Sequence, residues 1–314
     1  MTTRLRAVLA GLLLAVGALA AVVGVAHDDG DGTARGAATP ASKGAYVAIG
    51  DSYTAGQQIP DRTGEPAGCG RSDHNYPTQV AARLGVKAAD FDDVSCSGAT
   101  IADLTAPQAT RDGTNPAQLA ALSSKTRLVT IGIGGNDIDF IAMITRCVDL
   151  GGAYSSLDGG TISDDAPCRK YYVKNGTDSA RRLVAAAGER LSGALSEVRR
   201  RAPEARVYVV GYPAILPSDG AVCGRELPIA PGDITYLRET EQELNEALRV
   251  RAGAAGATYV DTYTPSRDHN ACSPEDTRWI EPLRPGSPAA AVHPNARGER
   301  GMADAVLRAV NASG

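Results

Sequence analysis

Short runs of consecutive apolar residues alternate along the chain with longer stretches in which apolar residues recur every three or four positions. The short runs are typical of strands in a parallel sheet, because both faces of such a sheet are covered. They lie at residues 45–50, 127–134, 205–211 and 257–261, and residues 91–95 are a further candidate strand. Helical spacing is found at residues 76–84, 116–122, 178–201, 233–252 and 295–310. This alternation predicts an α/β fold with a doubly wound parallel sheet.

Polar, glycine-rich stretches separate these elements and are expected to be loops. The longest are residues 57–75, 147–168, 216–231 and 262–292. Residues 147–168 are rich in glycine and serine and have a cysteine at each end, so we expect a surface excursion closed at its ends. One domain of about 270 residues is ordinary for this fold class.

The N-terminal residues differ from the rest of the chain. Two arginines precede an uncharged apolar stretch that ends in small residues. This pattern predicts a signal peptide over residues 1–26 and a flexible linker over residues 27–43, followed by the domain at residues 44–312. The apolar stretch is near the ~20 residues that span a bilayer, so an uncleaved signal anchor is the alternative. We therefore expect a secreted domain or one that is membrane-anchored and faces outward.

Charge and cysteine content narrow the class of protein. A formal net charge of −4 at pH 7 argues against nucleic-acid binding. Beyond the apolar segment stand six cysteines: Cys69, Cys96, Cys147, Cys168, Cys223 and Cys272. An even number in an exported chain predicts disulfides, with about fifteen possible pairings. Zinc is the competing interpretation, but no two cysteines have the spacing of a zinc site. We expect neither a metal nor a cofactor.

Polar or glycine residues follow three of the predicted strands. They are Ser52, Gly98 and Asn136. The carboxyl ends of parallel strands share one edge of the sheet, so these residues should converge. Among the four histidines, only His293 stands just before a proline at the start of a predicted helix, which places it near the same edge. The alternatives are that Ser52 only caps a helix and that His293 is a surface histidine.

Four sequence blocks occur in an order that resembles the SGNH (GDSL-type) hydrolase family. They are Gly50-Asp51-Ser52-Tyr53-Thr54-Ala55-Gly56, Cys96-Ser97-Gly98, Gly134-Gly135-Asn136-Asp137 and His293. The resemblance covers residues 45–312. It implies a three-layer α/β/α sandwich with a five-stranded parallel sheet of the flavodoxin-like type. It also implies hydrolysis of a small-molecule or lipid ester through an acyl-serine, carried out by a monomer.

The resemblance gives each block a chemical role. Ser52 is the expected nucleophile and His293 the base that takes its proton. The expected oxyanion hole consists of the N–H groups of Ser52 and Gly98 and the side-chain amide of Asn136. Asp51 directly precedes the nucleophile, and we expect it to form hydrogen bonds within the turn.

The chain departs from the family pattern at one position. Many members have aspartate three residues before the catalytic histidine, where this chain has Ala290. Either a main-chain carbonyl at Ala290 or Ala291 orients the ring, or a distant acid such as Asp261 does. Some actinobacterial members with several disulfides use a Ser–His dyad with such a carbonyl, and this chain resembles them. That likeness and the chain order suggest the pairs Cys69–Cys96, Cys147–Cys168 and Cys223–Cys272.

An exported serine esterase or lipase acting on acyl esters is the function that these patterns favour. The first alternative is a carbohydrate deacetylase on the same fold, for which aromatic sugar platforms are expected. With one tryptophan, Trp279, and an aromatic content of 4%, the sequence favours acyl chains. The second alternative is a non-catalytic binding protein, which would be expected to lack Ser52, His293 or Asn136.

Overall fold

The computed structural model describes residues 45–157, 166–219, 223–224 and 226–312. By its internal contacts the chain divides into residues 1–38 and residues 39–314, and all described residues belong to the second unit. The predicted signal peptide or anchor and the linker lie outside the described residues. Among the helices that the structure describes, none combines the length and the apolar character needed to cross a bilayer.

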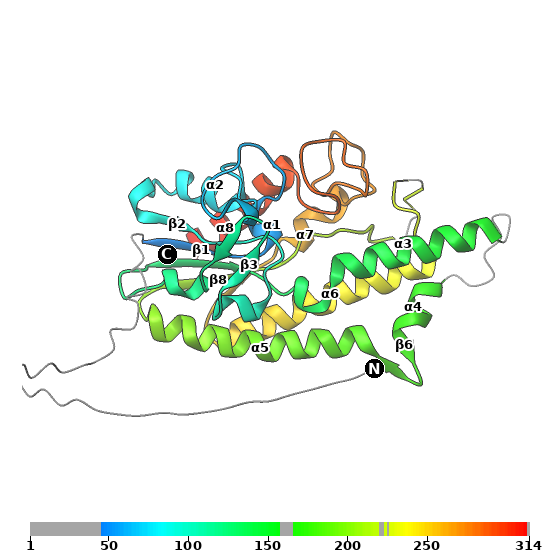
Figure 1. Ribbon diagram of the computed structural model, residues 1–314, viewed down its shortest axis with the longest axis horizontal. Coiled ribbons are helices and arrows are strands. Elements are labelled where there is room, and N and C mark those ends of the chain that lie inside the picture. The colour runs from blue at the N-terminus through cyan, green and yellow to red at the C-terminus, as the bar shows by residue number, and fades with distance from the viewer. Residues whose placement is uncertain (1–44, 158–165, 220–222, 225, 313–314) are drawn as a thin grey trace, which may run out of the picture. The chain divides into compact units, whose positions relative to one another are not determined.

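Five parallel strands form the central sheet, in the order β2-β1-β5-β8-β9 (Figure 1). Their bounds are Tyr46–Gly50 for β1, Phe91–Asp93 for β2, Leu128–Gly132 for β5, Arg206–Val210 for β8 and Thr258–Val260 for β9. Each of the five predicted strands is present. β1 pairs along its whole length with β5, from Tyr46 opposite Leu128 to Gly50 opposite Gly132. This pairing with β5 therefore fixes the position of the carboxyl end of β1 in the sheet.

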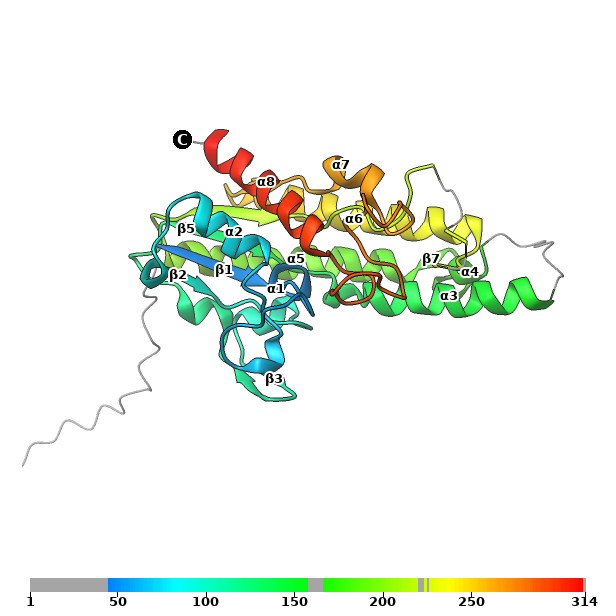
Figure 2. The same cartoon turned by 90° about the horizontal axis from the view of Figure 1, so that it is seen from above.

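Helices cover both faces of this sheet, as Figures 1 and 2 show. On one face lie α2 (Tyr76–Arg83) and α8 (Ala296–Ala312), and on the other lie α5 (Ser179–Arg201) and α6 (Pro231–Ala254). Side chains alternate between the two layers along β1: Tyr46 and Ala48 pack with the α2–α8 core, Val47 and Ile49 with the α5–α6 core. The expected α/β/α sandwich is confirmed.

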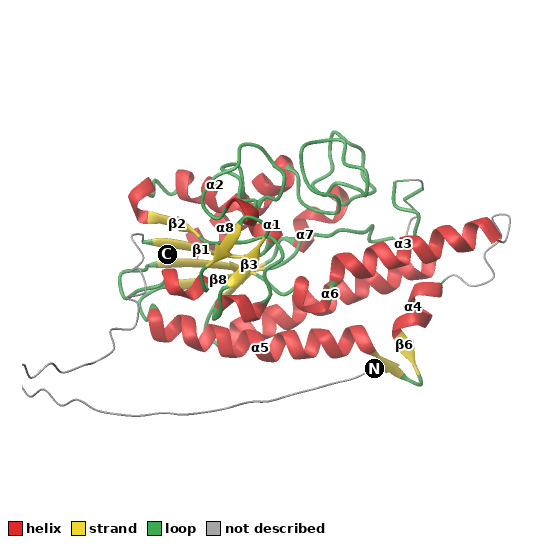
Figure 3. Cartoon of the chain, viewed as in Figure 1, coloured by secondary structure: helices red, strands yellow, loops and turns green. Residues whose placement is uncertain are grey.

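Further elements and loops surround the carboxyl edge of the sheet. They are the helices α1 (Ser52–Ala55), α3 (Phe140–Leu157), α4 (Pro167–Tyr172) and α7 (Tyr263–Ser266), and two hairpins, β3 (Gln108–Thr110) with β4 (Gly113–Asn115) and β6 (Val173–Lys174) with β7 (Thr177–Asp178). Much of the remaining chain at this edge is irregular and is drawn green in Figure 3.

Two sequence predictions about local structure are wrong. Residues 147–157, expected to be loop, form the second half of α3. Gly151 lets this helix pass close to another segment, because a Cβ there would lie 2.6 Å from the carbonyl oxygen of Pro228. Residues 116–122 were expected to form a helix but contain only a short 3₁₀ turn, Gln118–Ala121. The amide of Gln118 bonds both the N–H and the C=O of Gly50, at 2.8 and 3.0 Å.

The six cysteines form three disulfides, Cys69–Cys96, Cys147–Cys168 and Cys223–Cys272. These are the pairs that chain order and the resemblance suggested. Cys147–Cys168 joins α3 to α4. Cys69–Cys96 ties the loop after α1 to the segment after β2, and Cys223–Cys272 ties the loop before α6 to the segment that leads to His293.

Candidate active site

Ser52 lies at a sharp turn between β1 and α1. A Cβ at Gly50 would lie 2.5 Å from the carbonyl oxygen of Gly132, so the turn requires glycine. The carboxylate of Asp51 accepts the N–H of Tyr53 at 2.9 Å and is the N-cap of α1. Asp51 therefore makes the hydrogen bond expected of it within the turn. It also does the capping that was the alternative role for Ser52, so the serine hydroxyl remains available for another partner.

Tyr212 connects this turn to the next strand end. Its hydroxyl donates to the second carboxyl oxygen of Asp51 at 2.5 Å and accepts the N–H of Gly135 at 2.7 Å. Burial raises the pKa of Asp51 to about 7, although the hydrogen bond from Tyr212 opposes the rise. Tyr212 follows β8, so this chain of contacts joins the carboxyl ends of three strands. The sequence analysis did not assign Tyr212 to the site.

The ring of His293 meets Ser52 on one side and a main-chain carbonyl on the other. Its Nε2 lies 2.8 Å from the Ser52 Oγ, and its Nδ1 lies 2.7 Å from the carbonyl oxygen of Ala291. A carbonyl oxygen only accepts, so the ring proton is on Nδ1, and Nε2 presents its lone pair to the serine hydroxyl. Burial lowers the pKa of His293 below its usual value of 6.5, and the bond to Ala291 opposes this shift only in part. The imidazole is therefore neutral near pH 7.

The structure distinguishes between the groups that the sequence left open as partners of His293. Ala291 supplies the carbonyl at Nδ1, whereas the carbonyl of Ala290 accepts the backbone N–H of His293 at 3.2 Å. Asp261 accepts the N–H of Thr264 at 2.9 Å and lines a different groove, beside Arg267. Within the described residues, no carboxylate is hydrogen-bonded to the His293 ring.

The expected oxyanion-hole residues lie in neighbouring segments. Ser52 is the first residue of α1, where the N–H groups have no partner within the helix. Asn136 follows β5, and its side-chain amide donates one hydrogen to the carbonyl of Ala99 at 2.9 Å, which leaves the second for a ligand. Gly98, with a φ of +79°, precedes Ala99 in a segment that Cys96 fastens to the end of β1 through its N–H bond to Gly50, at 2.9 Å.

A small pocket opens beside the serine. Its lining residues are Asp51, Ser52, Tyr53, Gly135, Asn136, Phe140, Ile141, Tyr212, Glu241 and Leu244. The part lined by Phe140, Ile141 and Leu244 is apolar. Glu241 is buried there, and burial raises its pKa well above the usual value. The hydrogen bond from the N–H of Ile215, at 3.3 Å, opposes this rise only in part. Within the described residues, no group of three His, Cys, Asp or Glu side chains is arranged to hold a metal ion.

Comparison with known proteins identifies this arrangement. The sequence pattern of the GDSL-like Lipase/Acylhydrolase family matches residues 48–300, a span that includes all four blocks. The chain belongs to this family. It is 43% identical to "Lipase 2" of Streptomyces coelicolor over 307 residues, which cover 96% of this chain and 95% of that lipase. "Lipase 1" of the same organism is 32% identical and covers 95% of this chain and of its own length.

Solved structures share the fold. Phospholipase A1 from Streptomyces albidoflavus NA297 superposes with a TM-score of 0.67 at 29% identity, covering 85% of this chain and 99% of that enzyme. The extracellular lipase from Streptomyces rimosus gives a TM-score of 0.66 at 26% identity, covering 84% of this chain and 98% of that lipase. The chain is thus a carboxylic ester hydrolase of the GDSL family with the flavodoxin-like sandwich of that family.

Proposed function

We propose that this GDSL-family member is an exported lipase or esterase that cleaves acyl esters through an acyl intermediate on Ser52, with His293 as the base of a Ser–His dyad. One observation carries the proposal: the Ser52 Oγ touches His293 Nε2, while Nδ1 of the same ring bonds a backbone carbonyl. A serine hydroxyl is a weak nucleophile until a base accepts its proton.

The reaction follows from this geometry. His293 takes the proton of the Ser52 hydroxyl as Oγ attacks the carbonyl carbon of the ester. The N–H groups of Ser52 and Gly98 and the amide of Asn136 stabilise the resulting oxyanion. The imidazolium then gives its proton to the leaving alcohol, and an acyl-serine remains. Water attacks this intermediate with His293 again as base, which releases the acid and restores the serine.

The carbonyl of Ala291 replaces the carboxylate of a triad in one respect only. It fixes the tautomer and the orientation of the His293 ring, as an aspartate would. Because it carries no net charge, it stabilises the transient imidazolium less. Catalysis by this dyad therefore relies more on the oxyanion hole and on exact placement of the ring.

The pocket beside Ser52 favours acyl chains over acetylated sugars. Its apolar wall of Phe140, Ile141 and Leu244 suits a hydrocarbon chain. Trp279 is not part of this wall. It stacks on His269 with a centroid distance of 5.2 Å and packs against Gly301 of α8. The tryptophan that a sugar platform would need is used in packing.

Export is part of the same proposal. Three disulfides suit an oxidising compartment, and the N-terminal pattern suits a signal peptide or anchor over residues 1–26 with a linker to residue 43. The Streptomyces rimosus relative is described as an extracellular lipase. Mass spectrometry of the protein recovered from the culture medium or the membrane tests cleavage directly.

A substrate panel tests the activity. Purified enzyme is assayed on p-nitrophenyl esters from acetate to palmitate and on acetylated xylan, and a serine-directed alkyl phosphonate is used as label. We expect ester hydrolysis, phosphonate on Ser52 and little release of acetate from xylan. Labelling of another serine would contradict the assigned nucleophile. Fast deacetylation of xylan with slow hydrolysis of every acyl ester would favour the carbohydrate esterase.

A further inference from the structure

His293 lies in a segment held by only a few backbone hydrogen bonds. The N–H of Val292 donates to the carbonyl of Glu281 at 2.9 Å, and the N–H of Glu281 donates to the carbonyl of His293 at 3.0 Å. Glu281 is thus the backbone partner of the residues around the proposed base. Contacts that hold Glu281 in place therefore also hold the backbone of His293 in place.

Val292 stands between the two groups that must face each other. Ala291 supplies the carbonyl acceptor and His293 the ring N–H, so the backbone of Val292 sets their relative orientation. Its φ is +61°, a value that a β-branched residue rarely adopts unless its surroundings impose it. One such restraint is the Tyr53 hydroxyl, which donates to the Val292 carbonyl at 2.5 Å. If the restraints weaken, the backbone is expected to relax and the Nδ1–H to lose its acceptor.

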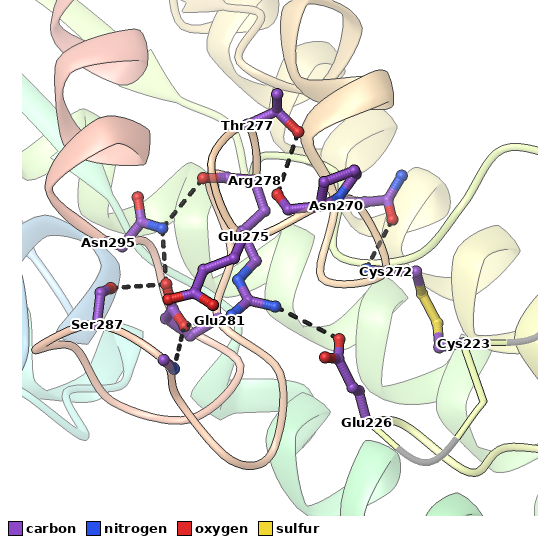
Figure 4. Close-up of polar contacts among 12 residues, drawn as sticks. Cys223, Glu226, Asn270, Cys272, Glu275, Thr277, Arg278, Glu281, Ser287 and Asn295 are labelled. Carbon is purple, nitrogen blue, oxygen red and sulfur yellow. Dashed lines mark hydrogen bonds and ion pairs between the residues drawn. A yellow bond between two sulfur atoms is a disulfide. The ribbon is translucent and has the colours of Figure 1, made fainter.

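The buried side chain of Glu281 binds residues that lie before and after His293 in the chain (Figure 4). Before His293 in the chain, it accepts the N–H of Gly286 at 2.8 Å and the hydroxyl of Ser287 at 2.7 Å. After His293, it accepts the amide of Asn295 at 2.8 Å. Arg278, also buried, lies 3.5 Å away.

The carboxylate remains charged in this buried site. Burial acts to raise the pKa of Glu281, but the hydrogen bonds from Asn295, Ser287 and Gly286 and the charge of Arg278 together bring it below the usual value. Charge-assisted hydrogen bonds of this kind are stronger than neutral ones. The loop is therefore clamped by an ion rather than by a neutral acid.

We propose that Glu281 is a positioning residue for catalysis, whose carboxylate clamps the chain before and after His293 and so keeps the Ala291 carbonyl on Nδ1. This inference rests on the proposed Ser52–His293 mechanism. Glu281 thus helps to orient the ring indirectly, through the backbone, whereas a triad aspartate orients it by direct contact.

The chain offers a matched control in Glu226. This exposed carboxylate pairs with the same Arg278, at 3.4 Å, but does not contact the His293 loop. Glu281→Gln and Glu226→Gln make the same chemical change on opposite sides of Arg278. Because misplacement of a catalytic group by about 1 Å can cost about 10²-fold in rate, we expect Glu281→Gln to lower kcat by about that factor with KM nearly unchanged. Glu226→Gln should leave both constants near the wild-type values.

Two further measurements separate positioning from a general loss of stability. The bond to Ala291 raises the pKa of His293, so its loss in Glu281→Gln should move the acidic limb of the kcat/KM profile to lower pH. Proton NMR of ¹⁵N-histidine-labelled protein should show a hydrogen-bonded Nδ1–H signal for His293 in the wild type and in Glu226→Gln. This signal should be lost or shifted in Glu281→Gln. All assays are run well below the melting temperature of each variant.

The outcomes are decisive in each case. A folded Glu281→Gln with wild-type kcat and an unchanged Nδ1–H signal would overturn the proposal, and so would a change confined to KM. If that variant does not fold, Ser287→Ala removes a single donor to the carboxylate. It must then lower kcat more than Glu226→Gln, and equal effects would overturn the proposal. If the wild type hydrolyses no ester, the proposed function has failed. In that case the His293 Nδ1–H signals of the three proteins alone test whether Glu281 holds the Ala291 carbonyl on Nδ1.

Discussion

The proposed nucleophile and the proposed base are held by two different kinds of structure. Ser52 follows a strand with neighbours on both sides, and a capped helix begins at the serine itself. His293 lies in an irregular stretch between α7 and α8 (Figure 3), which is held by a few backbone hydrogen bonds to Glu281 and by side-chain hydrogen bonds. The nucleophile is thus placed by regular local structure, and the base by contacts between distant residues. Variants in the two regions should accordingly fail in different ways.

Tyr53 joins the two regions. It follows Ser52 in α1, its hydroxyl bonds the carbonyl of Val292, and its ring centroid lies 4.8 Å from that of His293. Tyr53, in the regular structure around Ser52, therefore directly restrains the irregular segment that carries His293. This arrangement suits the proposed dyad, because among the described residues no carboxylate is hydrogen-bonded to the ring.

Removing either member of the dyad should have the largest effect. We expect Ser52→Ala and His293→Ala each to lower kcat by about 10⁶-fold, as in a comparable serine hydrolase, and the double variant to cost little more. The reason is that the two groups act as one unit. Unfolding followed by circular dichroism should show that Ser52→Ala keeps the fold. Substantial ester hydrolysis by either single variant, measured at high enzyme concentration, would remove the dyad from the mechanism.

Loss of the Tyr53 hydroxyl should have a smaller effect than loss of either dyad member or of the Glu281 carboxylate. Tyr53→Phe keeps the ring but frees the Val292 carbonyl, and a hydrogen bond worth about 1.4 kcal/mol corresponds to roughly tenfold in kcat. Tyr46→Phe is the matched control. It removes a buried hydroxyl that bonds Thr130 at 3.0 Å inside the sheet, so it should cost stability but leave kcat within about twofold. Equal kcat values for the two variants would contradict the proposed link between the two regions.

The Asp51 carboxyl should give the nucleophile region a pH-dependent stability. Its pKa is about 7 in the folded chain because of burial, against 3.8 for the ordinary group. The folded state therefore holds its proton more tightly than the unfolded state. The stabilisation is complete below about pH 4 and is lost as the pH rises to about 7, at about 1.4 kcal/mol per pH unit.

Urea unfolding of the wild type and of Asp51→Asn between pH 4 and 8 measures this contribution as a difference between the two proteins. Titrations at other sites are common to both and cancel. The free energy of unfolding should fall less steeply with pH in the variant. Parallel curves would show that Asp51 titrates normally.

The sequence predicted the regular half of the molecule better than the irregular half. All five strands were located, four of them by apolar runs, and Ser52 stands just after β1, as its motif predicted. The second half of α3 was missed because the sequence there is rich in glycine and serine, whereas in the structure Gly151 allows a close approach to Pro228.

The contacts of the irregular half have no local signal. Nothing in the sequence around Glu281 predicts that its carboxylate bonds Ser287 and Asn295. Nothing around Tyr212 predicts its bond to Asp51. Sequence reasoning could narrow the partner of His293 only to a nearby carbonyl or a distant acid. The choice depends on how the loop folds back on itself, which a pattern of apolar and polar positions does not contain.

The smallest effects should come from the two positions that a triad would have made critical. Asp261 caps the turn that begins α7 and does not reach His293, so Asp261→Asn should change kcat by no more than about twofold. Ala290 contributes backbone groups, its N–H to Gln57 and its carbonyl to His293, and a small side chain such as that of Ala290→Ser leaves both in place. Neutralising a true triad aspartate lowers kcat by about 10⁴-fold, so the two mechanisms differ by orders of magnitude. Steady-state kinetics on one ester decides between them: a collapse of activity in a folded Asp261→Asn would mean that the acid reaches the ring during catalysis and that the Ala291 carbonyl is not its final partner.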